Sequence, residues 1–217
     1  VAEKVDGIIF DLDGTLWDAT DSSSKAWSKT AENFSLKRSV APEDLKSVIG
    51  LPFEECIQNL FGDSATPELI EELEKNEIYF IQKFGGILYP EVEETLKKLS
   101  THFPLYLVSN CQTWYLEAFF NHHPLQKYFQ DSLCFGMTLK PKSENLKMIL
   151  KKHQMKCPFY VGDTHWDFEA CQKANVKFIF AKYGLGKLKD PRSIISMDRF
   201  SDLTNIFDLT TRTFQKS

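Results

Sequence analysis

Short apolar runs that alternate with helical patterns most limit the folds open to this chain. The apolar runs are nearly continuous, as expected for strands whose two faces are both covered. They are VDGIIF (5–10), FPLYLVS (103–109), SLCFGM (132–137), PFYVG (158–162) and VKFIFA (176–181). Between them, stretches such as PEVEETLKKLS (90–100) place apolar residues on one helical face. This alternation predicts an α/β fold with a doubly wound, Rossmann-like parallel sheet.

The segment from about Trp17 to Gly86 interrupts the alternation. Its sequence has no convincing strand pattern, and the stretches 22–34, 41–50, 53–61 and 66–84 look helical. In the last stretch we expect Thr66 to cap the helix and Gly85 to end it. Its expected apolar stripe is Ile70, Leu73, Phe80, Ile81 and Phe84. We therefore predict an all-helical cap domain, residues 17–86, inserted into a catalytic core of residues 1–16 and 87–217.

Length, charge and cysteine usage narrow the class of protein. The 217 residues allow one large domain or one domain with a smaller insertion. A net charge of −4 argues against a nucleic-acid partner, and no apolar run approaches the ~20 residues of a membrane helix. The five cysteines form no C-x-x-C pair and indicate free thiols in a reducing compartment. With no signal-peptide pattern, we expect a cytoplasmic protein, monomeric by default.

Polar side chains follow three of the predicted strands. The first strand runs into Asp11-Leu12-Asp13-Gly14-Thr15, and another ends in Ser109-Asn110. The strand at 158–162 runs into Asp163, with Asp167 four residues further on. Because ligands bind at the carboxyl ends of strands in an open parallel sheet, we expect these side chains to meet at one edge.

Several carboxylates in one crevice repel one another unless a cation lies among them. Asp11 and Asp13 are two residues apart, so the strand pleat would point both the same way. Gly14 permits a tight turn whose backbone N–H groups can face an anion. Oxygen ligands without Cys or His favour Mg²⁺, which keeps coordination positions for water and a phosphate. The sequence therefore predicts a Mg²⁺ site at this edge.

Four motifs together resemble a known family. DLDGTLWD (11–18), LVSN (107–110), LKPKSENL (139–146) and VGDTHWD (161–167) are similar, in this order, to the motifs of the haloacid-dehalogenase-like (HAD) hydrolase superfamily. The chain looks most similar to the phosphoglycolate-phosphatase and beta-phosphoglucomutase branch, which the helical insertion also fits. The resemblance covers essentially the whole chain; its motifs are specific for the superfamily and weak on substrate.

The resemblance implies a Mg²⁺-dependent phosphatase acting on a small phosphorylated metabolite. Asp11 would attack phosphorus to form an aspartyl-phosphate, and Asp13 would act as general acid and then general base. Asp11, the backbone carbonyl of Asp13, and Asp163 would hold Mg²⁺. Asp167 would support the metal's surroundings or orient a lysine.

The resemblance also implies residues that hold the phosphoryl oxygens. These are Ser109 and Asn110, together with backbone groups near Gly14. The active-site lysine has two candidates, because a Lys-Pro form of the motif selects Lys140 and a Pro-Lys-x-Glu-Asn form selects Lys142. We favour Lys142, since it is closest to the expected helix start at about Ser143, and keep Lys140 as the alternative.

Other functions remain open at this point. A sugar-phosphate phosphomutase is disfavoured because the cap segment IGLPFEE (49–55) supplies Glu54 and Glu55 but no basic residue. A dehalogenase is disfavoured because that branch lacks the acid/base aspartate. A non-catalytic phosphate-responsive module is a further alternative, although every expected catalytic position is filled. The segment GLGK (184–187) fits neither a dinucleotide nor a P-loop motif, and we expect it to close over the site.

Overall fold

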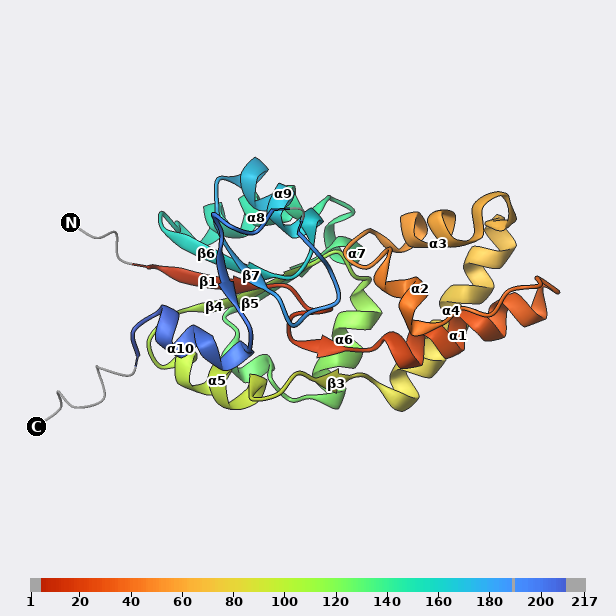
Figure 1. Cartoon of the computed structure of the whole chain (residues 1–217), viewed down its shortest axis with the longest axis horizontal. Helices are drawn as coiled ribbons and strands as arrows, with labels where there is room; N and C mark the ends of the chain where they lie inside the picture. Colours follow the sequence, from red (N-terminus) through yellow and green to blue (C-terminus); the bar gives the residue numbers. More distant parts are fainter. Residues whose placement is uncertain (1–4, 189, 210–217) are drawn as a thin grey trace, which may run out of the picture.

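The computed structural model describes residues 5–188 and 190–209. Figure 1 shows a layered α/β part lying beside a separate group of helices. The α/β part contains the strand ends at which the sequence places its polar residues. The position of the helical group relative to those strand ends therefore bears directly on function.

One sheet runs through the α/β part, with six strands among the described residues. Across the sheet the order is β5 (Asp131–Cys134), β4 (Leu105–Ser109), β1 (Gly7–Phe10), β6 (Pro158–Gly162), β7 (Lys177–Ala181) and β8 (Ile195–Met197). Every neighbouring pair in this order is parallel. The chain goes from β1 to β4 on one side and later returns to β6 on the other. The ends of β1, β4 and β6 are thus adjacent at a switch point, and the α/β prediction is confirmed.

Helices cover both faces of the sheet (Figure 1). One face packs against α5 (Val92–Ser100), α6 (Thr113–His122) and α10 (Leu203–Ile206), and the other against α8 (Lys142–His153) and α9 (His165–Ala174). The pleat of β1 sends Ile8 and Phe10 into the first core cluster and Ile9 into the second. Because both faces are covered, all of β1 is buried, which explains its uninterrupted apolar run.

The helical group has a hydrophobic core of its own. It consists of α1 (Thr20–Asn33), α2 (Pro42–Lys46), α3 (Phe53–Phe61) and α4 (Pro67–Phe84), with a 3₁₀ turn at Gly62–Ser64. Trp27 of α1, Ile57 of α3, and Leu69 and Leu73 of α4 are buried in one cluster. The group therefore buries apolar surface internally rather than only against the sheet.

The helical group is joined to the α/β part by a short pair of strands. β2 (Trp17–Asp18) pairs antiparallel with β3 (Ile87–Leu88). The expectation of no strand within 17–86 is wrong at this point, because two residues are too few to form a periodic pattern. Gly86 is required here, since a Cβ on it would lie 2.8 Å from the backbone oxygen of Asp18.

Several helix and strand boundaries also differ from expectation. The strand expected over 132–137 ends at Cys134, and α7 (Phe135–Thr138) follows it. α5 begins at Val92, since Glu91 adopts a left-handed conformation with φ of 62°. α2 ends at Lys46, earlier than the stretch 41–50 suggested. The remaining short 3₁₀ turns are Gln126–Tyr128 and Phe200–Asp202.

Helix α4 matches its predicted ends and most of its predicted apolar face. Thr66 accepts a hydrogen bond from the backbone N–H of Leu69, and Gly85 ends the helix with φ of 63°. The buried residues are Leu69, Leu73, Glu77 and Ile81, whereas Phe84 is 56 % exposed. The expected stripe is right at Leu73 and Ile81, and Ile70 and Phe80 pack partly buried against the helical core. It is wrong at Phe84 and lacks Leu69, because an i, i+4 series starting at Leu69 faces inward. This rotation places one carboxylate, that of Glu77, in the interior.

Candidate active site

Three carboxylates meet where β1 and β6 end. Asp11 directly follows β1, Asp163 directly follows β6, and Asp167 lies in the first turn of α9. One oxygen of each lies within 4.8 Å of the others. Their exposed fractions are 2 %, 0 % and 0 %. The structure thus brings together, in a buried acidic cluster, the side chains of three of the four residues predicted at the metal site; the fourth, Asp13, was predicted to contribute its backbone carbonyl.

Lys142 supplies positive charge to this cluster. It is the first residue of α8 and is 3 % exposed. Its Nζ lies 2.9 Å from Asp11 Oδ1 and 2.5 Å from Asp167 Oδ1. Burial acts to lower the pKa of Lys142, but the two carboxylates outweigh it and raise the pKa. Lys140, the alternative candidate, is exposed and does not line the site.

The N-terminus of α9 holds Asp167 in place. Thr164 caps the helix: its Oγ1 accepts from the backbone N–H of Asp167 at 3.1 Å and donates to Asp167 Oδ2 at 2.7 Å. The backbone N–H of Thr164 donates to the same Oδ2 at 2.9 Å. Burial opposes ionisation of Asp167, but Lys142 and Thr164 outweigh it and lower the pKa. One oxygen of Asp167 therefore serves the helix cap and the other serves the lysine.

The GLGK segment holds Asp163. The backbone N–H groups of Leu185 and Gly186 each donate to Asp163 Oδ2 at 2.8 Å. Gly14 lies against the same carboxylate with φ of 73°, and a Cβ on it would overlap Asp163. Burial and the neighbouring Asp167 nevertheless raise the pKa of Asp163 to about 7.

The acidic cluster fits a divalent cation. Burial, Asp167 and Asp163 together raise the pKa of Asp11 despite Lys142. Asp11 Oδ1 is buried, and Lys142 Nζ, at 2.9 Å, is its ion-pair partner. Three carboxylates against one ammonium leave negative charge uncompensated. Oxygen-only ligands of this kind suit a hard divalent metal ion.

Asp13 faces a cavity rather than the acidic cluster. Its Oδ1 accepts hydrogen bonds from the Tyr115 hydroxyl at 2.6 Å and from Trp17 Nε1 at 3.1 Å. Burial raises the pKa of Asp13 to about 6, against the effect of these two donors. Sequence reasoning missed Tyr115. No local signal in α6 marks it, because its contact with Asp13 spans 102 residues and depends on packing.

The residues predicted to hold phosphoryl oxygens divide into two groups. Ser109 and Asn110, at the end of β4, line the cavity, whereas Gly14 lies behind it against Asp163. Ser109 Oγ accepts from the backbone N–H of Cys111 at 3.2 Å. Asn110 Nδ2 donates to the backbone oxygen of Gly50 at 2.7 Å. That bond links the edge of the sheet to the loop between α2 and α3.

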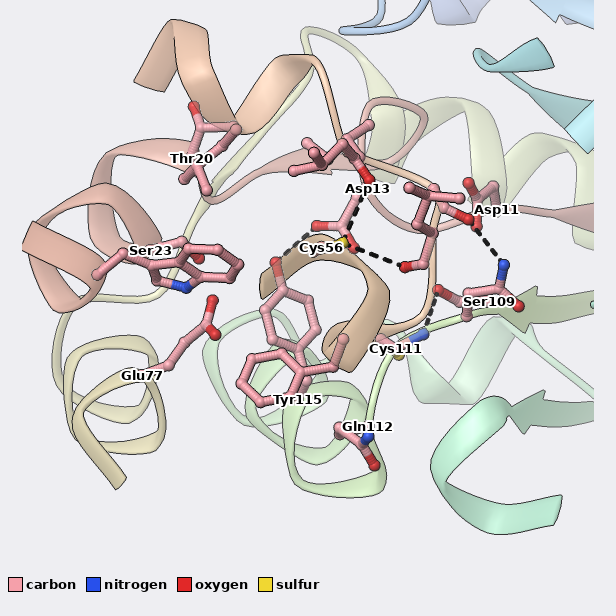
Figure 2. A pocket seen from close by; sticks show the side chains of 18 of the residues that line it. Asp11, Asp13, Thr20, Ser23, Cys56, Glu77, Ser109, Cys111, Gln112 and Tyr115 are labelled. Carbon is pink, nitrogen blue, oxygen red and sulfur yellow. Dashed lines mark hydrogen bonds between the residues drawn. The ribbon is translucent and has the colours of Figure 1, made fainter. Parts of the chain in front are cut away.

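The cavity, of about 100 Å³, lies between the sheet edge and the helical group (Figure 2). Figure 2 shows Asp11 and Ser109 on one side and Ser23 and Glu77 on the other. The α/β part contributes Asp11, Asp13, Ser109, Asn110, Cys111, Gln112, Trp114, Tyr115 and Lys142 to its lining. The helical group contributes Thr20, Ser23, Trp27, Leu45, Val48, Ile49, Gly50, Leu51, Phe53, Cys56 and Glu77.

The helical wall of the cavity differs from the expected one. Glu54 and Glu55 are exposed and do not line it, while Phe53 and Cys56 do. Glu77 was missed by sequence reasoning. The signal for it was available, because an acidic residue stood midway between Leu73 and Ile81 at helical spacing.

A family model described as "Haloacid dehalogenase-like hydrolase" matches residues 8–181. The chain therefore belongs to the haloacid dehalogenase-like hydrolase family, and the family and enzyme class indicated by its motifs are confirmed.

Curated relatives and solved structures agree with this assignment. A phosphoglycolate phosphatase from Aquifex aeolicus is 28 % identical over 93 % of this chain and 96 % of its own length. Another from Photobacterium profundum is 27 % identical over 95 % of this chain and 97 % of its own. The crystal structure of a predicted phosphoglycolate phosphatase from Haemophilus somnus has a TM-score of 0.80 at 20 % identity, covering 95 % of this chain and 99 % of that one. This structural likeness supports the fold.

Within residues 5–188 and 190–209, no helix is both long enough and apolar enough to cross a bilayer.

Proposed function

We propose that the protein is a Mg²⁺-dependent phosphatase that hydrolyses a small phosphomonoester through an aspartyl-phosphate on Asp11. The observation that carries the proposal is the placement of Asp11 and Asp13. Asp11 lies in the acidic cluster beside Lys142, and the side chain of Asp13 faces the same cavity as Asp11. A nucleophile and a proton donor thus reach one cavity from positions two residues apart in the sequence.

In the first half-reaction, a carboxylate oxygen of Asp11 attacks phosphorus and the bond to the ester oxygen breaks. Asp13 gives its proton to that leaving oxygen, so an alcohol departs. Tyr115 and Trp17 hold the Asp13 carboxyl toward the cavity while the proton moves. Lys142 offsets the repulsion between the Asp11 carboxylate and the phosphate.

In the second half-reaction, water attacks phosphorus and passes a proton to Asp13. The bond between phosphorus and Asp11 breaks, which restores the carboxylate and releases inorganic phosphate. Ser109 and Asn110 would hold the phosphoryl oxygens, with backbone groups near Gly14. Mg²⁺, held by Asp11, the backbone carbonyl of Asp13 and Asp163 with Asp167 behind them, would neutralise charge on the phosphate.

The proposal includes the division of the chain. Residues 17–86 would form the cap domain, and residues 1–16 and 87–217 the catalytic core. The separate hydrophobic cluster of α1 to α4 and the β2–β3 pair at the two crossings support this division. The cap would exclude water during phosphoryl transfer and select the leaving group.

One candidate substrate and one alternative reaction accompany the proposal. Phosphoglycolate is a candidate because the curated relatives are named for it. A sugar-phosphate mutase is the second candidate reaction. It is disfavoured because, among the described residues lining the cavity, Lys142 alone carries a basic side chain, and a second phosphate would need another.

The first test is hydrolysis of p-nitrophenyl phosphate by the wild type and by Asp11→Asn. We expect turnover that requires Mg²⁺, is lost in EDTA, and falls at least roughly a thousandfold in the variant, because its amide is a poor nucleophile. Asp21→Asn, at an exposed aspartate of α1, is the matched control and should retain wild-type turnover.

Turnover retained by Asp11→Asn would overturn the nucleophile assignment, and metal-independent turnover would overturn the Mg²⁺ assignment. Isomerisation of a sugar phosphate without net phosphate release would favour the mutase.

A further inference from the structure

Glu77 is a buried carboxylate that the proposed reaction does not use. It is 5 % exposed, lines the cavity from α4, and its Oε2 has no hydrogen-bond partner among the described residues. Figure 2 shows its side chain pointing into the pocket between Ser23 and Tyr115. An unpaired oxygen on a buried carboxylate is costly, so such an oxygen in a ligand cavity indicates a partner from outside the chain.

Among the described residues, the charged groups that act most strongly on Glu77 are both acidic. Asp13 and Glu74 raise its pKa, and Glu77 in turn raises the pKa of Cys56 and Tyr115. Burial is the largest cause and brings the pKa of Glu77 to about 7, against the effect of Ser23 and Trp27. Lys142 is no counter-charge for Glu77, because its ammonium is engaged by Asp11 and Asp167.

The part of the cavity around Glu77 disfavours an anionic leaving group. A carboxylate on the substrate would face Glu77, and Lys142, the cation among the described lining residues, is engaged by Asp11 and Asp167. Apolar side chains such as Leu51 and Phe53 line the same cavity and suit an alkyl chain. A positively charged group at the end of a short alkyl chain would satisfy both features.

We propose that the substrate is the phosphate ester of a short amino alcohol, whose ammonium group is bound by Glu77. The inference rests on the proposed phosphatase function and specifies its leaving group. It separates this chain from an enzyme specific for phosphoglycolate, whose leaving group is an anion. The ammonium would pair with the Glu77 carboxylate, while the phosphate lies at Asp11.

The test compares esters that differ in one group. 2-Aminoethyl phosphate is compared with propyl phosphate, and 3-aminopropyl phosphate with butyl phosphate, so that a methyl group replaces the ammonium. Phosphoglycolate is the anionic member. For the wild type we expect kcat/KM for at least one amino ester to exceed that of its neutral partner by roughly 10- to 100-fold, as for a hydrogen bond to a charged group.

Glu77→Gln should bring that ratio close to one, because the amide keeps the shape but not the charge. Glu71→Gln is the matched control: it changes an exposed glutamate on the same helix and should keep the wild-type ratio. A wild-type ratio of one or less, a preference for phosphoglycolate, or an unchanged ratio in Glu77→Gln would each overturn the inference. Absence of turnover with every ester, p-nitrophenyl phosphate included, would instead overturn the proposed function and the inference with it.

A second measurement tests the charge of Glu77 without substrate or turnover. The folded pKa of about 7 exceeds the ordinary 4.5, so the folded state binds this proton more tightly than the unfolded state. Stability is therefore lost as pH rises between these two values, and the wild type should weaken relative to Glu77→Gln between about pH 4.5 and pH 7. The opposite trend in urea unfolding would reveal a cation already paired with Glu77 and would overturn the inference.

Discussion

At the scale of single residues, the stability of the acidic cluster depends on the balance between its negative and positive charges. Asp11, Asp163 and Asp167 would repel one another in a buried space, and Lys142 is the cation that the described structure provides there. Removing one partner of a buried ionic cluster leaves the others uncompensated and destabilises by several kcal/mol. The two candidate lysines therefore differ sharply in what their replacement should do.

Lys142→Met should lower the free energy of unfolding by about 3–5 kcal/mol in metal-free buffer and should abolish phosphatase activity. Lys140→Met should change the free energy of unfolding by no more than about 0.5 kcal/mol, since its side chain is exposed. Its phosphatase activity should stay at the wild-type level. Urea unfolding at neutral pH and the p-nitrophenyl phosphate assay check both. Equal unfolding midpoints for the two variants would contradict the assigned charge balance.

At the scale of elements, two helix N-caps serve different purposes. Thr66 caps α4 far from the acidic cluster, by accepting from the backbone N–H of Leu69 at 3.3 Å. Thr164 caps α9 and also donates to the carboxylate that holds Lys142. The same chemistry stabilises a helix in one place and orients a site residue in the other.

Thr66→Ala and Thr164→Ala should each cost about 1 kcal/mol of unfolding free energy. Only Thr164→Ala should also lower kcat for p-nitrophenyl phosphate, by roughly tenfold, because Asp167 loses a donor that fixes its orientation. Loss of kcat in Thr66→Ala of the same size would show that helix stability, rather than the position of Asp167, controls activity. Thr164→Ser should restore most of the activity.

At the scale of the whole molecule, the acidic cluster ties distant segments together. Two of its members directly follow strands: Asp11 follows β1 and Asp163 follows β6. The other two lie in helices, Lys142 in α8 and Asp167 in α9. The cluster exists only in the folded chain, so a cation bound to it stabilises the whole fold by mass action.

Mg²⁺ should therefore raise the melting temperature. At a concentration a hundred times its dissociation constant the gain is about 2.7 kcal/mol, or about 5–10 °C for a chain of this size. Asp163→Asn should remove most of this shift, whereas Asp21→Asn should retain it. Calorimetry with and without Mg²⁺ checks both, and an unchanged shift in Asp163→Asn would place the metal elsewhere.

The sequence by itself determined the features that depend on residues close together in the chain, namely the strands and helices. Buried strands and amphipathic helices have their own periods, so the α/β class and the four helices of the insertion could be predicted from spacing alone. Since parallel strands end at one edge, the meeting of Asp11 and Asp163 followed from that class. Family resemblance supplied the roles assigned to them, not their geometry.

Tertiary packing determined which side chains of these elements reach the site, because the periodicity of the sequence does not specify this. Lys140 and Lys142 differ by two residues, yet only Lys142 begins a helix that points its side chain at the cluster. The contact of Tyr115 with Asp13 and the inward turn of Glu77 depend on how α6 and α4 settle against other elements. Such contacts join residues far apart in sequence, and the rotation of a helix about its axis is set by its neighbours. Helical spacing can place Glu77 on the same face as Leu73 and Ile81, but only the tertiary structure determined that this carboxylate lines the cavity opposite Asp11.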